Sequence, residues 1–113
     1  MNSRKEKSLA YVCAPYCADS IEGIDANINQ AVLFAQKVYE LGYVPLTPHL
    51  LFPFIKKEES EEQREWAVEA DLEILKMCDA LFVCGEKITN GMEKEIRLAN
   101  DLDLPINRLT FKE

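Results

Sequence analysis

The sequence is poor in the features that bind nucleic acid or span a membrane. Its 113 residues carry 13 Lys and Arg against 20 Asp and Glu, so the formal net charge is −7. Binding to a phosphate backbone or to an anionic membrane surface requires clustered basic side chains. The chain also contains no apolar run of about 18 residues, the length that a membrane-spanning helix needs. We therefore expect no nucleic-acid partner and no membrane partner.

Metal-binding and disulfide patterns are also scarce. The sequence has one histidine, His49, and four cysteines, none of which forms a Cys-x-x-Cys pair. A zinc site built from Cys13, Cys17 and His49 would be incomplete and oddly spaced. The first eight residues are polar and charged and do not resemble a signal peptide, so we expect a cytoplasmic protein with reduced thiols. The cysteines are then predicted to be small buried hydrophobes, and neither a metal nor a cofactor is expected.

Length and composition predict one folded domain over residues 1–113. Hydrophobic residues make up 48% and charged residues 29% of the chain, which is typical of a globular protein. Short apolar runs, which predict strands, alternate with apolar residues at helical spacing. Strands are expected at 9–13, 43–46, 80–85 and 105–109, and helices at 24–41, 60–77 and 91–101. This alternation predicts an α/β fold with a parallel sheet and helices on both faces.

In such a sheet, ligands bind beyond the carboxyl ends of the strands, at the point where the strand order reverses. The loops after Cys13, Leu46 and Gly85 lie at this end. A ligand site is therefore expected among these loops.

Two carboxylates fall on the apolar faces of the last two predicted helices. Glu95 lies near the middle of the apolar face of the helix at 91–101, and Asp71 lies on the packed side of the preceding helix. Burying an unpaired carboxylate costs several kcal/mol unless it is protonated, paired or hydrogen-bonded. Structural explanations remain open: Glu95 accepts bonds from the amides of its own helix start, or Asp71 caps a neighbouring loop.

A shared cleft would give the two acids a chemical role. Two carboxylates in one cleft have their pKa values pushed apart, which leaves one ionised nucleophile and one proton donor. That combination is required to act at the anomeric carbon of a sugar. The residues thus favour glycosidic chemistry at Glu95 and Asp71, provided that both side chains face the same hollow.

The same residues carry a resemblance to the nucleoside 2-deoxyribosyltransferase family. Leu81–Gly85 and then Thr89–Ala99 resemble a strand, a variable loop and a Gly-x-x-x-Glu motif that opens a helix. Asp71–Ala80 resembles the family's Asp-x-x-x-Leu-x-x-x-Asp segment, and Tyr11–Pro15 resembles its first strand and loop. The resemblance covers about residues 9–107 and is strongest to a compact, largely uncharacterised bacterial and phage branch.

This resemblance implies a fold, a reaction and a set of site residues. The fold is a flavodoxin-like three-layer sandwich with a parallel sheet of four to five strands. The reaction is cleavage or transfer of the N-glycosidic bond of a (deoxy)nucleoside or nucleotide through a covalent deoxyribosyl-enzyme. Glu95 matches the nucleophile, Asp71 the acid that assists the leaving base, and Tyr11 a strand tyrosine that orients the nucleophile. The expected substrate-binding residues are Pro15, Tyr16, His49, Thr89, Asn90, Gly91 and Met92.

Two departures from the family pattern keep a second function open. Many members carry an acidic residue shortly before the Gly-x-x-x-Glu motif, where this chain has Thr89 and Asn90. The loop at 16–23 contains no Lys or Arg, which disfavours a phosphorylated substrate. The alternative is a non-catalytic nucleotide-binding or sensing module on the same fold.

A third hypothesis is a structural or assembly subunit. Phe52, Phe54 and Trp66 lie on or beside the long connection before the second long helix, and aromatic side chains are enriched at interfaces. Small sheet domains also close their edges by dimerising. A homodimer or a higher homo-oligomer is therefore expected.

Overall fold

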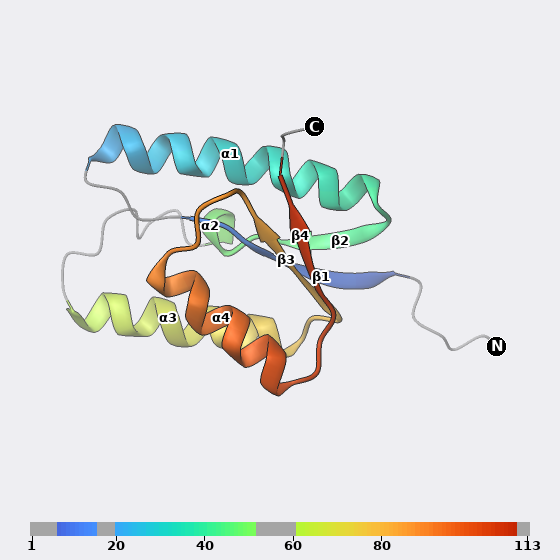
Figure 1. The fold of residues 1–113 in the computed structure, drawn as a ribbon. Helices are drawn as coiled ribbons and strands as arrows, with labels where there is room; N and C mark the ends of the chain where they lie inside the picture. Colours follow the sequence, from blue (N-terminus) through green and yellow to red (C-terminus); the bar gives the residue numbers. More distant parts are fainter. Residues whose placement is uncertain (1–6, 16–19, 52–60, 111–113) are drawn as a thin grey trace.

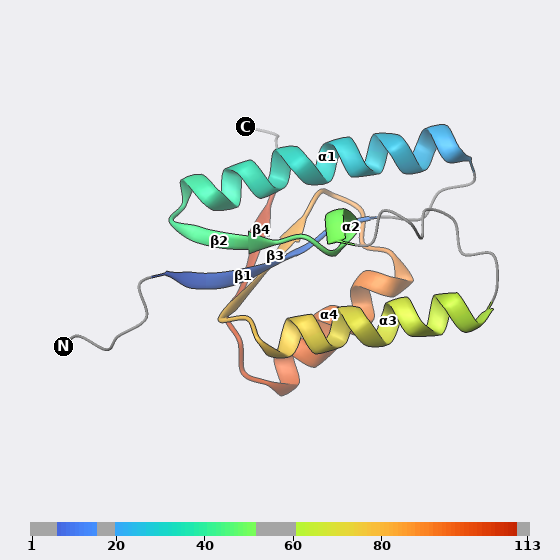
Figure 2. The ribbon, with the colours of Figure 1, turned by 180° about the vertical axis from the view of Figure 1, so that it is seen from behind.

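A four-stranded parallel sheet separates two layers of helices in the computed structural model, which describes residues 7–15, 20–51 and 61–110 (Figure 1). Helix α1 covers one face, and α3 and α4 cover the other, as Figure 2 shows from behind. The elements in chain order are β1 (Ser8–Cys13), α1 (Ile21–Glu40), β2 (Tyr43–Leu46), α2 (Pro48–Leu51), α3 (Glu61–Lys76), β3 (Ala80–Cys84), α4 (Asn90–Asp101) and β4 (Ile106–Leu109). The predicted α/β fold with a parallel sheet is confirmed.

The strand order is β2-β1-β3-β4, with every neighbouring pair parallel. The chain leaves the central strand β1 for the edge strand β2, and then returns across the sheet to β3 through α3. The direction of progression therefore reverses between β1 and β3, where α/β sheets bind their ligands. Residues that follow Cys13 and Cys84 lie at this position.

Side-chain alternation along the two central strands produces two cores. Tyr11 and Cys13 of β1 face α3 and α4, together with Leu81 and Val83 of β3. Residues of the opposite parity in both strands pack with Phe34 and Val38 of α1 instead. This second cluster comprises Ala10, Val12, Ala14, Phe34, Val38, Phe82 and Cys84. The strands are buried on both faces, which explains their continuous apolar sequences.

Local sequence signals set the helix ends. The Ser20 side chain accepts a hydrogen bond from the Gly23 N–H, and α1 therefore starts at Ile21, three residues before the predicted start. Thr89 caps α4 in the same way through the Met92 N–H. After α1 the chain turns at Gly42 with φ of 102°, a conformation that favours glycine.

Asp79 fixes the start of β1. Its Oδ2 atom accepts a hydrogen bond of 2.8 Å from the Leu9 N–H, and its own N–H donates to the Leu9 carbonyl over 2.8 Å. Asp79, the residue just before β3, is thus hydrogen-bonded to β1 through both its side chain and its main chain. Asp79, the second aspartate of the segment from Asp71 to Asp79, therefore has a structural role. Among the described helices, none has the length and apolar character needed to cross a membrane.

Candidate active site

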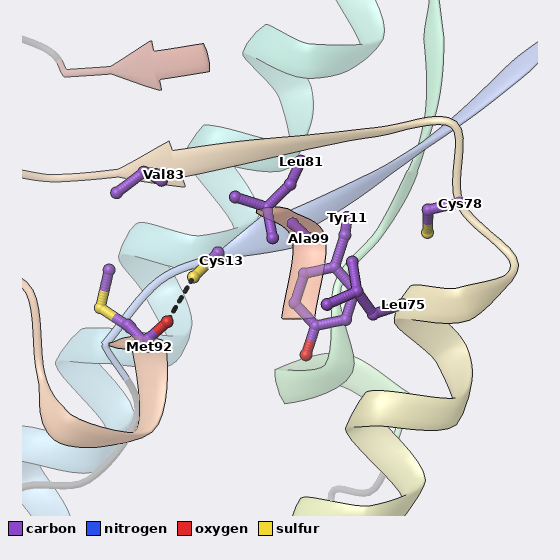
Figure 3. Close-up of a cluster of buried hydrophobic side chains, with 8 residues drawn as sticks. All are labelled: Tyr11, Cys13, Leu75, Cys78, Leu81, Val83, Met92 and Ala99. Atoms are coloured by element: carbon purple, nitrogen blue, oxygen red, sulfur yellow. Dashed lines mark hydrogen bonds between the residues drawn. The ribbon is translucent and has the colours of Figure 1, made fainter. Parts of the chain in front are cut away.

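The candidate site lies between β1, α3 and α4. Alternation along β1 places Tyr11 and Cys13 on the same face of the sheet, two residues apart. Glu95 lies in the second turn of α4, which follows the carboxyl end of β3. In Figure 3 the Tyr11 ring extends from β1 beside Leu75 of α3 and Ala99 of α4. The central strand and both covering helices thus contribute to the site.

Both oxygens of the Glu95 carboxylate accept hydrogen bonds from β1. The Tyr11 hydroxyl donates to Oε2 over 2.7 Å, and the Cys13 thiol lies 3.1 Å from Oε1. Tyr11 and Cys13 are fully buried, whereas Glu95 is partly buried. The carboxylate is therefore held from the sheet side at both oxygens.

Burial and these two donors act on Glu95 in opposite directions. Burial raises the pKa of the Glu95 carboxyl above its usual value of 4.5, because the charged form loses hydration. The hydrogen bonds from Tyr11 and Cys13 favour the charged form and lower the pKa, but the net direction is upward. The site thus contains a partly dehydrated carboxyl group whose ionisation depends on its two donors.

Asp71 of α3 acts electrostatically on the same tyrosine. Burial raises the pKa of the Tyr11 phenol well above 10.0, and the negative charges of Glu95 and Asp71 raise it further. Asp71 is partly buried, and its Oδ1 atom is shielded from solvent. Tyr11 therefore interacts electrostatically with Glu95 and Asp71, the two acids that were predicted to lie on the packed faces of their helices. The inward positions of Glu95 and Asp71 agree with the helical-wheel prediction.

The start of α4 holds four of the expected substrate-binding residues. Thr89 is the N-cap, and its hydroxyl accepts the Met92 N–H over 3.2 Å. Asn90 and Gly91 follow and are exposed. The Met92 side chain is only 2% exposed and belongs to the core cluster on the face of the sheet that α3 and α4 cover. Asn90 and Gly91 are therefore the accessible members of this group.

The remaining expected residues lie at or beyond the limits of the described structure. Tyr16 falls outside the described residues, and for His49 only the backbone, within α2, is described. Pro15 lines a depression of about 270 Å³ on the α1 side of the sheet. Its other lining residues are Ala14, Asn27, Gln30, Phe34, Gly85, Glu86, Lys87 and Thr110. This depression lies at the carboxyl ends of β1 and β3, on the face opposite α3 and α4.

Cys13 is the site residue that the sequence interpretation missed. It was expected to be a small buried hydrophobe, and it is buried, but its thiol also contacts the Glu95 carboxylate. The signal was its position two residues after Tyr11 in a strand, which predicts that both side chains share a face.

Within the ranges that the structure describes, no group of three His, Cys, Asp or Glu side chains is arranged to hold a metal ion.

The fold and the site together define a small α/β domain with a partly buried Tyr-Glu hydrogen bond at one face of a parallel sheet. The chain belongs to the family described as "Domain of unknown function (DUF7768)", whose model matches residues 8–109. No curated protein sequence matches the chain.

A solved structure with a similar fold is that of a 2-deoxyribosyltransferase from Bacillus psychrosaccharolyticus. The two structures superpose with a TM-score of 0.69, and 19% of the aligned residues are identical. The alignment covers 91% of this chain and 72% of the other chain. At this identity the similarity shows a shared fold.

Proposed function

We propose that the protein cleaves or transfers the N-glycosidic bond of a 2-deoxynucleoside or a related nucleoside, with Glu95 as the nucleophile. The observation that carries this proposal is the hydrogen bond of 2.7 Å from the buried Tyr11 hydroxyl to Glu95. A carboxylate held in this way presents a fixed orientation to a substrate. The fold shared with a 2-deoxyribosyltransferase supports the choice of reaction.

In the first step, an ionised oxygen of Glu95 attacks the anomeric carbon of the sugar. The bond from that carbon to the base nitrogen breaks, and its electron pair remains on the nitrogen. Asp71 donates a proton or a hydrogen bond to the leaving base, which lowers the cost of the charge developing there. Its place on α3, close enough to Tyr11 for its charge to act there, supports this role. The product of this step is a glycosyl ester on Glu95 and a free base.

In the second step, water or a second base attacks the same carbon on the face that the first base left. The bond to the Glu95 oxygen breaks, the carboxylate is regenerated, and Asp71 takes up the proton that the attacking water or base loses. Two displacements retain the configuration at the anomeric carbon. Water as the acceptor gives hydrolysis, and a base gives transfer.

The test uses the full chain with each common 2-deoxynucleoside, with and without a second free base. Chromatography measures release of the first base and formation of a new nucleoside. Glu95→Gln is the test variant. Glu93→Gln is the matched control, because Glu93 lies on the same helix, two residues away, and is exposed. Mass spectrometry of the denatured protein seeks one added deoxyribosyl group on Glu95.

The expected result is turnover by the wild type and by Glu93→Gln, and loss of turnover by Glu95→Gln. Activity that survives in Glu95→Gln would overturn the assignment of the nucleophile. Nucleotide binding seen by calorimetry, without release of base and undiminished in Glu95→Gln, would instead identify a non-catalytic binding module.

A further inference from the structure

The Cys13 thiol has two acceptors within reach at the inner face of the sheet. Its sulfur lies 3.1 Å from Glu95 Oε1 and 3.9 Å from the Met92 carbonyl oxygen, the contact drawn in Figure 3. A thiol carries one hydrogen and donates it to one acceptor at a time. The shorter contact leads to a carboxylate, and hydrogen bonds to charged acceptors are the stronger ones. The geometry therefore favours donation to Glu95.

Tyr11 and Cys13 together hold the carboxylate at both ends. Tyr11 donates to Oε2, and Cys13 donates to Oε1. Both donors project from β1, which is hydrogen-bonded to β2 on one side and to β3 on the other. The final torsion of a Glu side chain has a broad energy profile, so one hydrogen bond leaves the second oxygen able to swing. A second donor from the same rigid strand removes this freedom.

The thiol remains a donor throughout the physiological pH range. Burial raises the pKa of Cys13, and the negative charge of Glu95 raises it further, with a smaller contribution from Cys84. Among the residues that the structure describes, the titratable groups that act on the Glu95 carboxylate are Tyr11 and Cys13 from β1, and the charge of Asp71 on α3 acts on Tyr11. Because the thiol and the phenol both stay protonated, each presents a hydrogen atom to the carboxylate.

We propose that Cys13 is a positioning residue for Glu95: its thiol fixes Oε1 while Tyr11 fixes Oε2, so that the nucleophile is presented in one orientation. This inference rests on the proposed function of Glu95. Cys13 is fully buried, and no direct contact with the substrate is assigned to it. Its effect on the reaction passes entirely through the carboxylate.

The test compares Cys13→Ala, which removes the donor, with Cys13→Ser, which keeps a donor at the same position. Cys84→Ala is the matched control, because Cys84 is equally buried but packs on the opposite face of the sheet. Cys13→Ala is expected to lower kcat about tenfold, the effect of one hydrogen bond to a charged group, with little change in KM. The acidic limb of its pH–rate profile is expected to move toward higher pH. The Cys13 hydrogen bond favours the ionised carboxylate, so its loss raises the pKa of Glu95. Cys13→Ser is expected to restore most of the rate.

Two kinetic outcomes would overturn the proposal. One is a Cys13→Ala variant with the wild-type kcat and pH profile. The other is a Cys84→Ala variant that loses as much activity as Cys13→Ala, since this would indicate a general packing effect. Either result, with Glu95→Gln still inactive, leaves the proposed function intact and removes only the role of Cys13.

A spectroscopic measurement tests the contact without any turnover. The S–H stretching band of a thiol lies in an open region of the infrared spectrum of a protein and moves to lower wavenumber when the thiol donates. The difference between the wild type and Cys13→Ala isolates the Cys13 band. In Glu95→Ala this band is expected to move to higher wavenumber, because the charged acceptor is gone. A band that does not move would overturn the proposal even if no substrate is turned over.

Discussion

Tyr11 and Glu95 are 84 residues apart in the sequence, and a hydrogen bond of 2.7 Å joins their side chains. The donor lies on the central strand β1, and the acceptor lies on α4, at the face of the sheet that α3 also covers. This contact connects the packing of the fold with its candidate chemistry. It exists only because α4 packs against the face of β1 that carries Tyr11.

Replacement of Tyr11 by Phe tests this contact directly. The phenyl ring keeps the apolar volume of a fully buried side chain but loses the donor to Oε2. We expect kcat to fall about 10- to 100-fold, the effect of one hydrogen bond to a charged group. The Tyr11 hydrogen bond lowers the pKa of Glu95, so its loss is expected to move the acidic limb of activity toward higher pH. Steady-state rates from pH 4 to pH 9, on the order of one point per half unit, would measure both effects.

An unchanged pH profile in Tyr11→Phe would contradict this prediction, whatever the change in rate. Circular dichroism serves as the control for folding. A variant that is folded and slow, with the acidic limb shifted, separates an effect on the carboxylate from damage to the core.

Asp71 is expected to affect only substrates that need help with the leaving group. We expect Asp71→Asn to lower kcat on natural deoxynucleosides about 100-fold, a usual size for loss of general acid catalysis. A deoxyriboside with a nitrophenol leaving group needs no protonation, and its cleavage should fall far less. Glu73→Gln is the matched control, because Glu73 lies on the same helix, with 71% of its side chain exposed. Equal losses on both substrates would exclude Asp71 as the acid.

Much of the fold could be predicted because its signals are local. The alternation of strand and helix patterns predicted the parallel sheet, and Gly42 marked the end of α1 as expected. The short helix α2, Pro48–Leu51, was not predicted, since four residues are too few to show a helical period. Local patterns thus identified the long elements and missed the shortest one.

The spacing of apolar residues predicted the helix α1 but does not determine which of them are buried. Val32 and Tyr39 are 45% and 68% exposed, whereas Phe34 is buried. A helix rich in apolar residues has several possible stripes, and its contact with the sheet selects one of them. Leu102, the apolar residue that caps the C-terminus of α4, is likewise 41% exposed. Which apolar residues are buried depends on tertiary contacts that periodicity does not contain.

The candidate site, too, could be predicted only in part from the sequence. The helical wheels placed Glu95 and Asp71 on packed faces, because an acid among apolar residues is a visible anomaly. The Cys13 contact with Glu95 joins residues 82 apart, and a buried cysteine in an apolar strand is no anomaly. This contact depends on how α4 packs against β1, which the sequence pattern does not show.

Asp79 is expected to stabilise the fold rather than act in the reaction. Its Oδ2 accepts the Leu9 N–H at the start of β1. We expect Asp79→Ala to lower the free energy of unfolding by about 1 kcal/mol, since it leaves that donor without its acceptor. Asp79→Asn keeps an oxygen acceptor and is expected to lose less. Urea unfolding measures both values, and a loss in Asp79→Asn as large as that in Asp79→Ala would contradict the role of this hydrogen bond.

The raised pKa of Glu95 predicts how its contribution to stability varies with pH. Well below pH 4.5, the usual pKa of this group, Glu95 is protonated in both the folded and the unfolded chain. As the pH rises above this value, the unfolded chain releases the proton first, because burial raises the pKa in the folded state. The folded state then binds more protons, so the free energy of unfolding falls with rising pH until the folded group also ionises.

Glu95→Gln cannot titrate, and it therefore lacks this loss of stability. The difference in the free energy of unfolding, Glu95→Gln minus wild type, is expected to increase from about pH 4 toward neutral pH and then to level off. Other carboxylates contribute equally to both proteins and cancel in the difference. Urea unfolding of the two proteins across this range measures it, with Glu93→Gln as the exposed control. A difference that stays constant with pH would show that Glu95 ionises equally easily in the folded and unfolded chains, and the site would then lack the dehydrated carboxylate on which the proposed chemistry depends.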